Sequence, residues 1–358
     1  MADHKRQALL VGSMPFESEE DAMNRALDAL GTDLWALPDG EIGEKSEKYP
    51  LGNRAAWVQA IIDICEQDHE NWEVVDRGVR GESGFPTGYG TGPRLKPKRS
   101  PSEMHKHLDF RWLQYFQKSY PIFKRLRQER GMPNLKFQVG LPTGMGITFG
   151  MMSPINALRY ASAFNKRMAY EANEMLKIAD SGDIIFQLEV PGELAMAYRM
   201  PKFMVNIPLR TILGLVKQIE PKASFGIHLC FGDLNNEALI KADILDKMVY
   251  FSNRLVDKWP KTHELRYLHY PLAEAADPPP LKAVYYEPLK NINLPANVRF
   301  VAGFVHDKRS EAEHQQILET IEGLRGHTVD IACSCGMGRR TPEMAKTLID
   351  VTHKLTKV

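Results

Sequence analysis

The sequence predicts an α/β protein, a single (β/α)8 TIM barrel that occupies residues 1–358. Eight short apolar segments recur along the chain, each is continuous in apolar character, and amphipathic segments lie between most of them. Parallel strands that are buried on both faces have this continuous pattern, and eight β units with intervening helices are typical of a barrel. The alternative is a doubly wound open sheet, but no G-x-G-x-x-G follows the first apolar segment.

The expected strands are short, and each is bounded by turn residues or by a helical pattern. In chain order they are residues 8–15, 32–41, 136–144, 183–193, 224–232, 264–271, 298–307 and 329–338. The clearest expected helices are residues 153–180 and 310–325, where apolar side chains recur at helical spacing. The basic start runs directly into the first strand, without the apolar core and cleavage site of a signal peptide.

The connection between the second and third expected strands, residues 44–135, is much longer than the others. Two helical patterns, 53–67 and 102–130, flank the turn-rich stretch VRGESGFPTGYGTGPRLKPKRSP. Long turn-rich connections are usually functional or mobile. Because this excursion follows a strand, we expect it at the carboxyl end of the barrel as a lid, with a surface insertion as the alternative.

Composition narrows the classes of partner. Hydrophobic residues make up 43% and charged residues 25% of the chain, as in globular proteins with a sizeable core. A net charge of +1 gives no reason to expect nucleic acid or an anionic membrane surface, and no segment approaches the roughly 20 apolar residues needed to span a bilayer. Four cysteines, two of them in a C-x-C, do not form a disulfide framework, so a reducing, cytoplasmic setting is expected. A homo-oligomer is compatible with the sequence.

Three residues suggest a metal site. His228 and Cys230 are two residues apart on an expected strand, so their side chains would leave the same face. Cys335, about a hundred residues later, would complete a His/Cys/Cys set of the soft ligands that select zinc. Three protein ligands leave one position open, as in catalytic zinc sites. The alternative is that all three are ordinary core residues.

Polar residues gather where the expected strands end, the place at which a barrel builds its active site. They are Gly12 and Ser13, Asp39 and Glu41, Thr143, Gln187, Glu189 and Glu193, His228, Cys230 and Asp233, His269, His306 and Asp307, and Cys333, Cys335 and Arg339. Charged groups in such a place are costly unless they are paired or bind a ligand. Their concentration at one end of the barrel therefore indicates a catalytic site.

Five segments resemble motifs of the cobalamin-independent methionine synthase-like family, whose superfamily includes uroporphyrinogen decarboxylase. The segments are LVGSMP, PDGE, QLEVPGE, HLCFGD and SCGMGRR, and they occur in the family's order on expected strands. The resemblance lies in motifs but runs along nearly the whole chain. It implies a TIM barrel, a zinc cofactor and transfer of an alkyl group to a thiol.

The resemblance implies roles for residues at matching positions. The implied zinc ligands are His228, Cys230 and Cys335. The implied substrate-binding residues are Gly12 and Ser13 for a carboxylate, and Glu41 and Glu189 for an amino group. Cys333, two residues before Cys335, is interpreted as core packing or a spare thiol, not as a primary ligand.

The chain also departs from the family. Where the family has a glutamate ligand on the sixth strand, this chain reads YLHYPLAEA, so His269 is the candidate fourth ligand, with Glu274 or water as alternatives. Where the family has a proton-donating histidine on the seventh strand, this chain reads GFVHDKRSE, so His306 and Asp307 are the candidate catalytic residues. Methionine synthase has two barrels, and the folate-binding contribution of the second is missing here.

A thiol with a pKa near ~8.5 is mostly protonated at neutral pH, and coordination to zinc deprotonates it. The sequence therefore predicts a zinc-dependent S-alkyltransferase, with methyl transfer to a small-molecule thiol such as homocysteine as the leading reaction and an unidentified alkyl donor. One alternative is a lyase or decarboxylase of the uroporphyrinogen decarboxylase kind, with Arg339, Arg340 and the arginines of residues 94–99 holding a polycarboxylate. Others are a zinc-dependent C–S lyase, an epoxide–thiol transferase, and a barrel that binds without catalysis.

Overall fold

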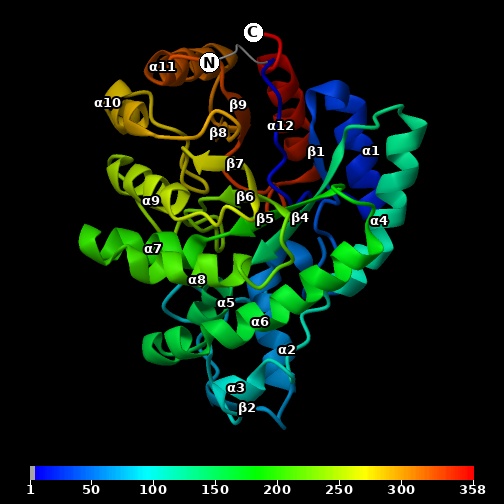
Figure 1. The fold of residues 1–358 in the computed structure, drawn as a ribbon, viewed down its shortest axis with the longest axis vertical. Coiled ribbons are helices and arrows are strands. Elements are labelled where there is room, and N and C mark those ends of the chain that lie inside the picture. The colour runs from blue at the N-terminus through cyan, green and yellow to red at the C-terminus, as the bar shows by residue number, and fades with distance from the viewer. Residues whose placement is uncertain (1–4) are drawn as a thin grey trace.

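The computed structural model describes residues 5–358 and contains a curled parallel sheet surrounded by helices (Figure 1). Seven strands form the sheet, in the order β1-β4-β5-β6-β7-β8-β9, so each strand from β4 onward pairs with the next along the chain. Their bounds are β1 (Ala36–Pro38), β4 (Lys136–Pro142), β5 (Ile184–Glu189), β6 (Ser224–His228), β7 (Glu264–Pro271), β8 (Arg299–Val305) and β9 (Asp330–Cys333).

Helices connect the strands and pack on the outside of the sheet. The α-helices are α1 (Glu19–Leu30), α2 (Trp57–Gln67), α3 (Pro101–Met104), α4 (Trp112–Glu129), α5 (Gly144–Met151), α6 (Pro154–Ile178), α7 (Pro191–Arg199), α8 (Asn206–Val216), α9 (Asp246–Asp257), α10 (Ala283–Tyr286), α11 (Glu311–Arg325) and α12 (Pro342–Leu355). The 3-10 turns are η1 (Gly31–Asp33), η2 (Arg54–Ala56), η3 (Lys202–Met204) and η4 (Glu287–Asn291). The predicted helices 153–180 and 310–325 are confirmed as α6 and α11.

The first predicted strand, residues 8–15, does not form a strand. Ala8 makes isolated parallel bridges to Leu34, before β1, and to Ile331 in β9, so the chain passes between the two edges of the sheet. The sheet is therefore a half-barrel of seven strands, similar to a TIM barrel, and the prediction of a closed eight-stranded barrel is wrong.

The amide of Leu9 still donates to the Ile331 carbonyl of β9, but side chains, not a neighbouring strand, bind the carbonyl groups of the next two residues. Gln138 Nε2, from β4, donates to the carbonyl oxygen of Leu10 at 2.8 Å and to that of Val11 at 3.0 Å. Gln187, from β5, donates to the same Val11 carbonyl. Because these carbonyls are satisfied from inside the sheet, the backbone leaves the ladder after Leu9 without burying an unpaired acceptor.

Two hydrophobic cores lie on the two sides of the sheet. The larger one fills the space between the strands and the helices. The smaller one lies within the curl and comprises Leu9, Val11, Ala36, Ile185, Tyr267, Val301 and Ala332. Tyr267 crosses this interior and donates its hydroxyl hydrogen to Gln187 Oε1 at 2.8 Å. The interior is thus filled by side chains, and a site can form only beyond the carboxyl ends of the strands.

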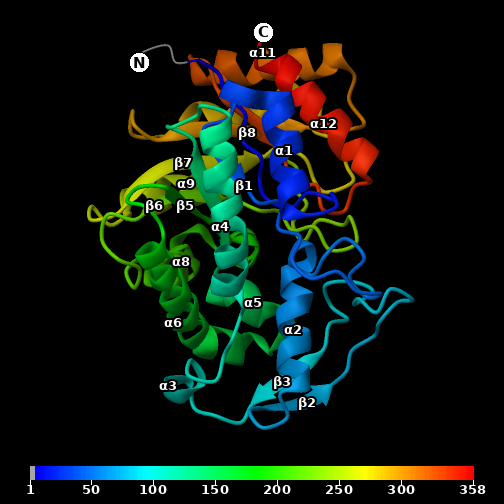
Figure 2. The same cartoon turned by 90° about the vertical axis from the view of Figure 1, so that its right-hand side faces the viewer.

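The excursion of residues 44–135 contains α2, the antiparallel strands β2 (Trp72–Asp76) and β3 (Arg94–Pro97), α3 and α4. In Figure 2, α2, β2, β3 and α3 lie together at the end of the molecule away from α11 and α12. The helix predicted at 102–130 is two helices, because the buried Glu171 of α6 accepts the amide hydrogens of Phe110 (3.2 Å) and Leu113 (3.1 Å). The carboxylate thereby caps α4 at a new starting point.

Several predicted strands end early. Residues 183–193 were expected as one strand, but β5 stops at Glu189, and α7 starts at Pro191, which fits the first turn of a helix and cannot continue a ladder. In the same way β6 stops at His228 and β9 at Cys333. Cys230 and Cys335 therefore lie in loops, two residues beyond the ends of their strands.

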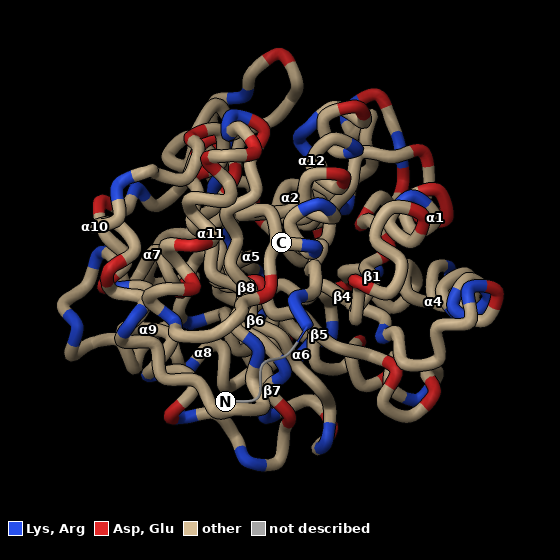
Figure 3. The backbone as a smooth tube through the Cα atoms, turned by 90° about the horizontal axis from the view of Figure 1, so that it is seen from above, with Lys and Arg blue, Asp and Glu red and all other residues tan. Residues whose placement is uncertain are grey.

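Lysine and arginine are interspersed with aspartate and glutamate around the backbone, without a large region of one sign (Figure 3). This agrees with the net charge of +1. Within residues 5–358, no helix is both long and apolar enough to cross a bilayer.

Asp33 joins the two ends of the described chain. Its side chain is 1% exposed, and Lys5 Nζ lies 2.8 Å from Oδ1. Thr356 Oγ1, just after α12, donates to Oδ2 at 3.1 Å, and Lys357 contacts the same oxygen. Burial opposes ionisation, but the hydrogen bonds from Lys357 and Lys5 outweigh it and lower the pKa of Asp33 to about 2.

We expect Asp33→Asn to lower the free energy of unfolding by about 2 kcal/mol at neutral pH. Because the folded pKa of about 2 lies below the ordinary value of 3.8, this stabilisation is complete above pH 3.8 and is lost as the pH falls toward 2. Urea unfolding at several pH values measures it. Asp350→Asn, which breaks an exposed pair with Lys346, is the control and should cost less than about 0.5 kcal/mol. An equal cost of Asp33→Asn at acid and neutral pH would contradict the assignment.

Candidate metal centre

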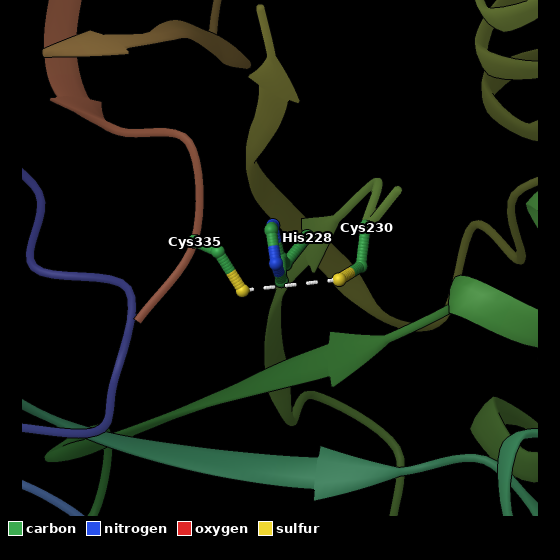
Figure 4. A group of neighbouring side chains, drawn as sticks. All are labelled: His228, Cys230 and Cys335. Carbon is green, nitrogen blue, oxygen red and sulfur yellow. Dashed lines mark hydrogen bonds between the residues drawn. The ribbon is translucent and has the colours of Figure 1, made fainter. Parts of the chain in front are cut away.

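His228, Cys230 and Cys335 converge at the carboxyl ends of β6 and β9 (Figure 4). One ligand atom of each residue lies within 4.8 Å of the other two. The two Sγ atoms are 3.9 Å apart, close to the separation of about 3.8 Å between two thiolates on one tetrahedral zinc ion. The structure thus brings together the three residues that the sequence predicts as metal ligands.

Hydrogen bonds determine which ring nitrogen of His228 has a free lone pair for a metal ion. The neighbouring His269 has its Nε2 2.9 Å from the carbonyl oxygen of Cys333, which can only accept, so Nε2 of His269 carries the hydrogen. Burial lowers the pKa of His269 to about 4, and burial followed by the neighbouring His269 lowers the pKa of His228 well below its usual value. Both rings are therefore neutral, and His269 Nδ1 is an acceptor.

His228 Nδ1 lies 2.7 Å from His269 Nδ1 and must donate to it. The lone pair of His228 is then on Nε2, which is buried and has no hydrogen-bond partner among the described residues. A buried nitrogen lone pair without a partner is unfavourable unless a ligand takes it. This observation fits a bound cation.

The two thiols fit the same interpretation. The contact with Cys230 and then burial raise the pKa of Cys335 well above its usual value. Two adjacent thiolates are unstable in such a place without a positive charge between them, which zinc would supply. His228 Nε2, Cys230 Sγ and Cys335 Sγ are the atoms that would hold the ion. The amide of Gly232 donates to Cys230 Sγ at 3.3 Å and adds a further partner to that sulfur.

The two candidate fourth ligands, His269 and Glu274, are engaged in other hydrogen bonds. Both ring nitrogens of His269 are occupied, by His228 and by the Cys333 carbonyl, so in this arrangement His269 supports His228 from behind. Glu274 accepts the amide hydrogen of Ala242. Among residues 5–358, the clustered His, Cys, Asp and Glu ligands are the three already described.

A second group of predicted residues forms a pocket next to this cluster. Glu189 is the last residue of β5 and pairs in register with His228 of β6. Glu41 and Glu189 line a pocket together with Arg54, Trp57, Trp112, Gly140 and Pro142. Burial and then Glu189 raise the pKa of Glu41, and burial and then Cys335 raise the pKa of Glu189. Two buried carboxylates in one pocket are suited to a cationic ligand.

Gly140 makes this pairing of carboxylates sterically feasible. A Cβ atom at residue 140 would lie 2.2 Å from Glu41 Oε1 and 3.6 Å from Glu189 Oε1. A Cβ at Gly12 would lie 2.6 Å from Glu41 Oε1. Trp112 Nε1, from the excursion, donates to the Gly140 carbonyl at 2.7 Å and fixes this strand end. Because Gly12 and Gly140 have no side chains, the Glu41 carboxylate fits between them.

Glu41 is held by a buried ion pair that reaches into the excursion. Its backbone has a φ of 48°, and its amide donates to Asp39 Oδ1 at 3.0 Å. Asp39 Oδ2 accepts from Arg54 Nη1 at 2.6 Å and from Ser119 Oγ at 2.7 Å. The sequence did not single out Arg54, because the spacing of residues in the excursion does not show which of them reaches a strand end.

Ser13 supports the loop that carries Cys335. Its carbonyl accepts the amide of Met337 at 2.7 Å, and its hydroxyl oxygen accepts the amide of Gly338 at 3.3 Å. The predicted carboxylate-binding role of Gly12 and Ser13 stays a prediction.

His306 and Asp307 line a second pocket that also includes Cys335, Arg339 and Arg340. The Lys308 amide donates to His306 Nδ1 at 3.1 Å, so Nε2 carries the hydrogen and donates to the Ala275 carbonyl at 3.1 Å. Burial lowers the pKa of His306. The ring is thus neutral, and its hydrogen is directed at the backbone. The predicted role of His306 and Asp307 as proton donors stays a prediction.

The arginines at this mouth are paired. Arg339 lies 3.3 Å from Asp233, and Arg340 lies 3.3 Å from Asp307. Arg94 donates to the Met152 carbonyl and Arg99 to Glu70. Since each guanidinium already has an acceptor, these residues do not form an open polycationic surface of the kind that a polycarboxylate would require.

Fold and site together define a TIM-barrel-like α/β protein with a candidate His/Cys/Cys metal cluster at the carboxyl ends of its strands. No protein-family model and no curated protein matches the chain. Among solved structures, the chain is similar to a B12-independent methionine synthase from Shewanella sp. W3-18-1 in complex with selenomethionine, with a TM-score of 0.58 and 13% identity over 99% of this chain and 97% of that one. At this identity the likeness establishes the shared fold alone.

We expect the purified protein to bind one zinc ion, and Cys335→Ser to lose it because only two ligands remain. Metal analysis after dialysis against a weak chelator measures the stoichiometry. Cys333→Ser is the matched control, since it changes a cysteine two residues away that is outside the cluster, and it should retain the ion. Equal metal content in the two variants would contradict the assigned site.

Proposed function

We propose that this protein is a zinc-dependent S-alkyltransferase that transfers a methyl group to a small thiol with an amino group, such as homocysteine. The observation that carries the proposal is the unpartnered Nε2 of His228, buried beside two cysteines and next to a pocket with two carboxylates. The similarity in fold to a methionine synthase is consistent with it.

A zinc ion bound by the cluster would hold the substrate sulfur as a thiolate at neutral pH. The protein's own residues orient the rest of the molecule. Glu41 and Glu189 would bind the substrate ammonium group, whose positive charge compensates carboxylates that are costly to ionise alone. Because Glu189 is level with His228 across two paired strands, an ammonium held there stands close to the metal ligands.

His306 and Asp307 are the proposed source of the proton for the leaving group. They line the same pocket as Cys335. Burial lowers the pKa of His306, so its ring, when protonated, would give up a proton more readily than an ordinary imidazolium. We therefore propose that the alkyl donor binds in the pocket of His306 and the thiol in the pocket of Glu41.

The proposal predicts that zinc-loaded protein converts homocysteine to methionine with at least one methyl donor from a panel of methylfolates, methylated amines and methylsulfonium compounds. Product is measured by mass spectrometry, with protein treated with a strong chelator as the control. Thiol consumption that persists after complete removal of the metal would refute the role of zinc, and loss of carboxyl groups from polycarboxylates would favour the decarboxylase alternative.

Glu41→Gln should lower kcat/KM for homocysteine by about 100-fold, because it removes one of two charges that would bind the ammonium group. The same variant should change kcat/KM for 4-mercaptobutanoate, which has no amino group, by less than about 3-fold. Comparing the two thiols at saturating donor separates recognition from damage to the site. Equal losses for both thiols would mean that Glu41 does not recognise the amino group.

A further inference from the structure

The hairpin loop of residues 77–93, between β2 and β3, lies far from the metal ligands in sequence but contacts the loop that follows Cys230. Its contact point is the turn of residues 234–237, in which Leu234 and Glu237 exchange backbone hydrogen bonds at 3.2 and 2.9 Å. Asn235 and Asn236 have φ values of 55° and 61°, as in a type I′ turn. This turn is therefore a compact unit that can be held from outside.

Tyr89 holds the turn with its hydroxyl group. The oxygen accepts the amide hydrogen of Leu234 at 2.9 Å, and the hydroxyl donates to the Glu237 carbonyl at 3.0 Å. A neighbouring contact strengthens the attachment, since Asn235 Nδ2 donates to the Pro86 carbonyl at 2.8 Å. One hydroxyl thus links both sides of the turn to the excursion.

The Tyr89 hydroxyl also lies against the residue that supports a metal ligand. A Cβ atom at Gly232 would be 2.6 Å from this hydroxyl, so the tyrosine packs directly on the Gly232 backbone. Gly232 has a φ of 84°, and its amide donates to Cys230 Sγ at 3.3 Å. A hydrogen bond from a backbone amide stabilises a cysteine sulfur that carries negative charge.

We propose that Tyr89 is a positioning residue for the metal centre: its hydroxyl holds the turn of residues 234–237 and the Gly232 backbone, so that the Gly232 amide points at Cys230 Sγ. The inference rests on the proposed role of Cys230 as a metal ligand. It assigns the excursion a role in metal binding, since removal of one oxygen atom in the hairpin loop would loosen a ligand in the loop that follows β6. Tyr89 itself touches neither the metal nor the substrate.

The test is Tyr89→Phe, which keeps the ring and removes the hydroxyl. Zinc affinity, measured in the full-length protein by competition with a chromogenic chelator, should weaken by about 10-fold, the lower end of the effect of losing an outer-shell partner. Amide hydrogen exchange in the metal-free protein should become faster in the segment of residues 231–237. The thermal unfolding midpoint should stay near that of the wild type, because Tyr89 is 40% exposed.

Tyr49→Phe is the matched control. Tyr49 belongs to the same excursion, but its hydroxyl donates to Asp63 at 2.6 Å, within the excursion itself. Its zinc affinity and its exchange in residues 231–237 should equal those of the wild type. Asn235→Ala, which removes the contact with Pro86, should shift both measurements in the same direction as Tyr89→Phe.

The outcomes separate this inference from the proposed function. If the wild type binds zinc and the zinc affinity of Tyr89→Phe is within 2-fold of the wild-type value, the positioning role is refuted while the metal site stands. If the wild type does not bind zinc, the proposed function and the positioning role both fail, and faster exchange in Tyr89→Phe would then report only a structural contact. If both tyrosine variants lose affinity equally, the effect belongs to the stability of the excursion and the inference is again refuted.

Discussion

His228 can offer a lone pair at Nε2 only because its Nδ1 hydrogen is bound by His269. That arrangement depends in turn on the Cys333 carbonyl, which fixes the hydrogen of His269 on the opposite nitrogen. Cys333 is the last residue of β9, and Cys335 follows two residues later, so one short segment both orients the histidine and supplies a thiol. The geometry of the cluster is thus set by the pairing of strands that curl toward each other, and a shift of β9 would disturb two ligands at once.

Burial also determines the charge of the carboxylate pocket. Glu41 and Glu189 are kept from water by two tryptophans, and their raised pKa values reflect the cost of that burial. Asp39 would add a third uncompensated charge, but Arg54 pairs with it at 2.6 Å. The excursion supplies this arginine. It therefore determines how much negative charge remains to bind a cationic ligand.

Much of the site could be predicted from the sequence, because its residues occur directly after apolar strands. His228, Cys230 and Cys335 form a cluster, and Glu41 and Glu189 share a pocket, as their positions at strand ends predict. The closure of the sheet could not be predicted: residues 8–15 are as apolar as a strand, but Gln138 and Gln187 bind the carbonyl groups that a ladder would use. The sequence pattern also could not show that Arg54 and Tyr89 reach the site, since their contacts depend on how a long excursion folds back onto the strand ends.

The excursion reaches the site at three separate points: Arg54 at Asp39, Trp112 at the Gly140 carbonyl, and Tyr89 at the turn after Cys230. A segment attached in this way cannot be exchanged between related chains as an independent module. A grafted replacement would have to supply a buried cation, an indole donor and a hydroxyl in the same places, or leave an acidic group and a carbonyl without partners. Redesign of ligand binding in this half-barrel is therefore better directed at side chains within the two pockets than at replacement of the whole excursion.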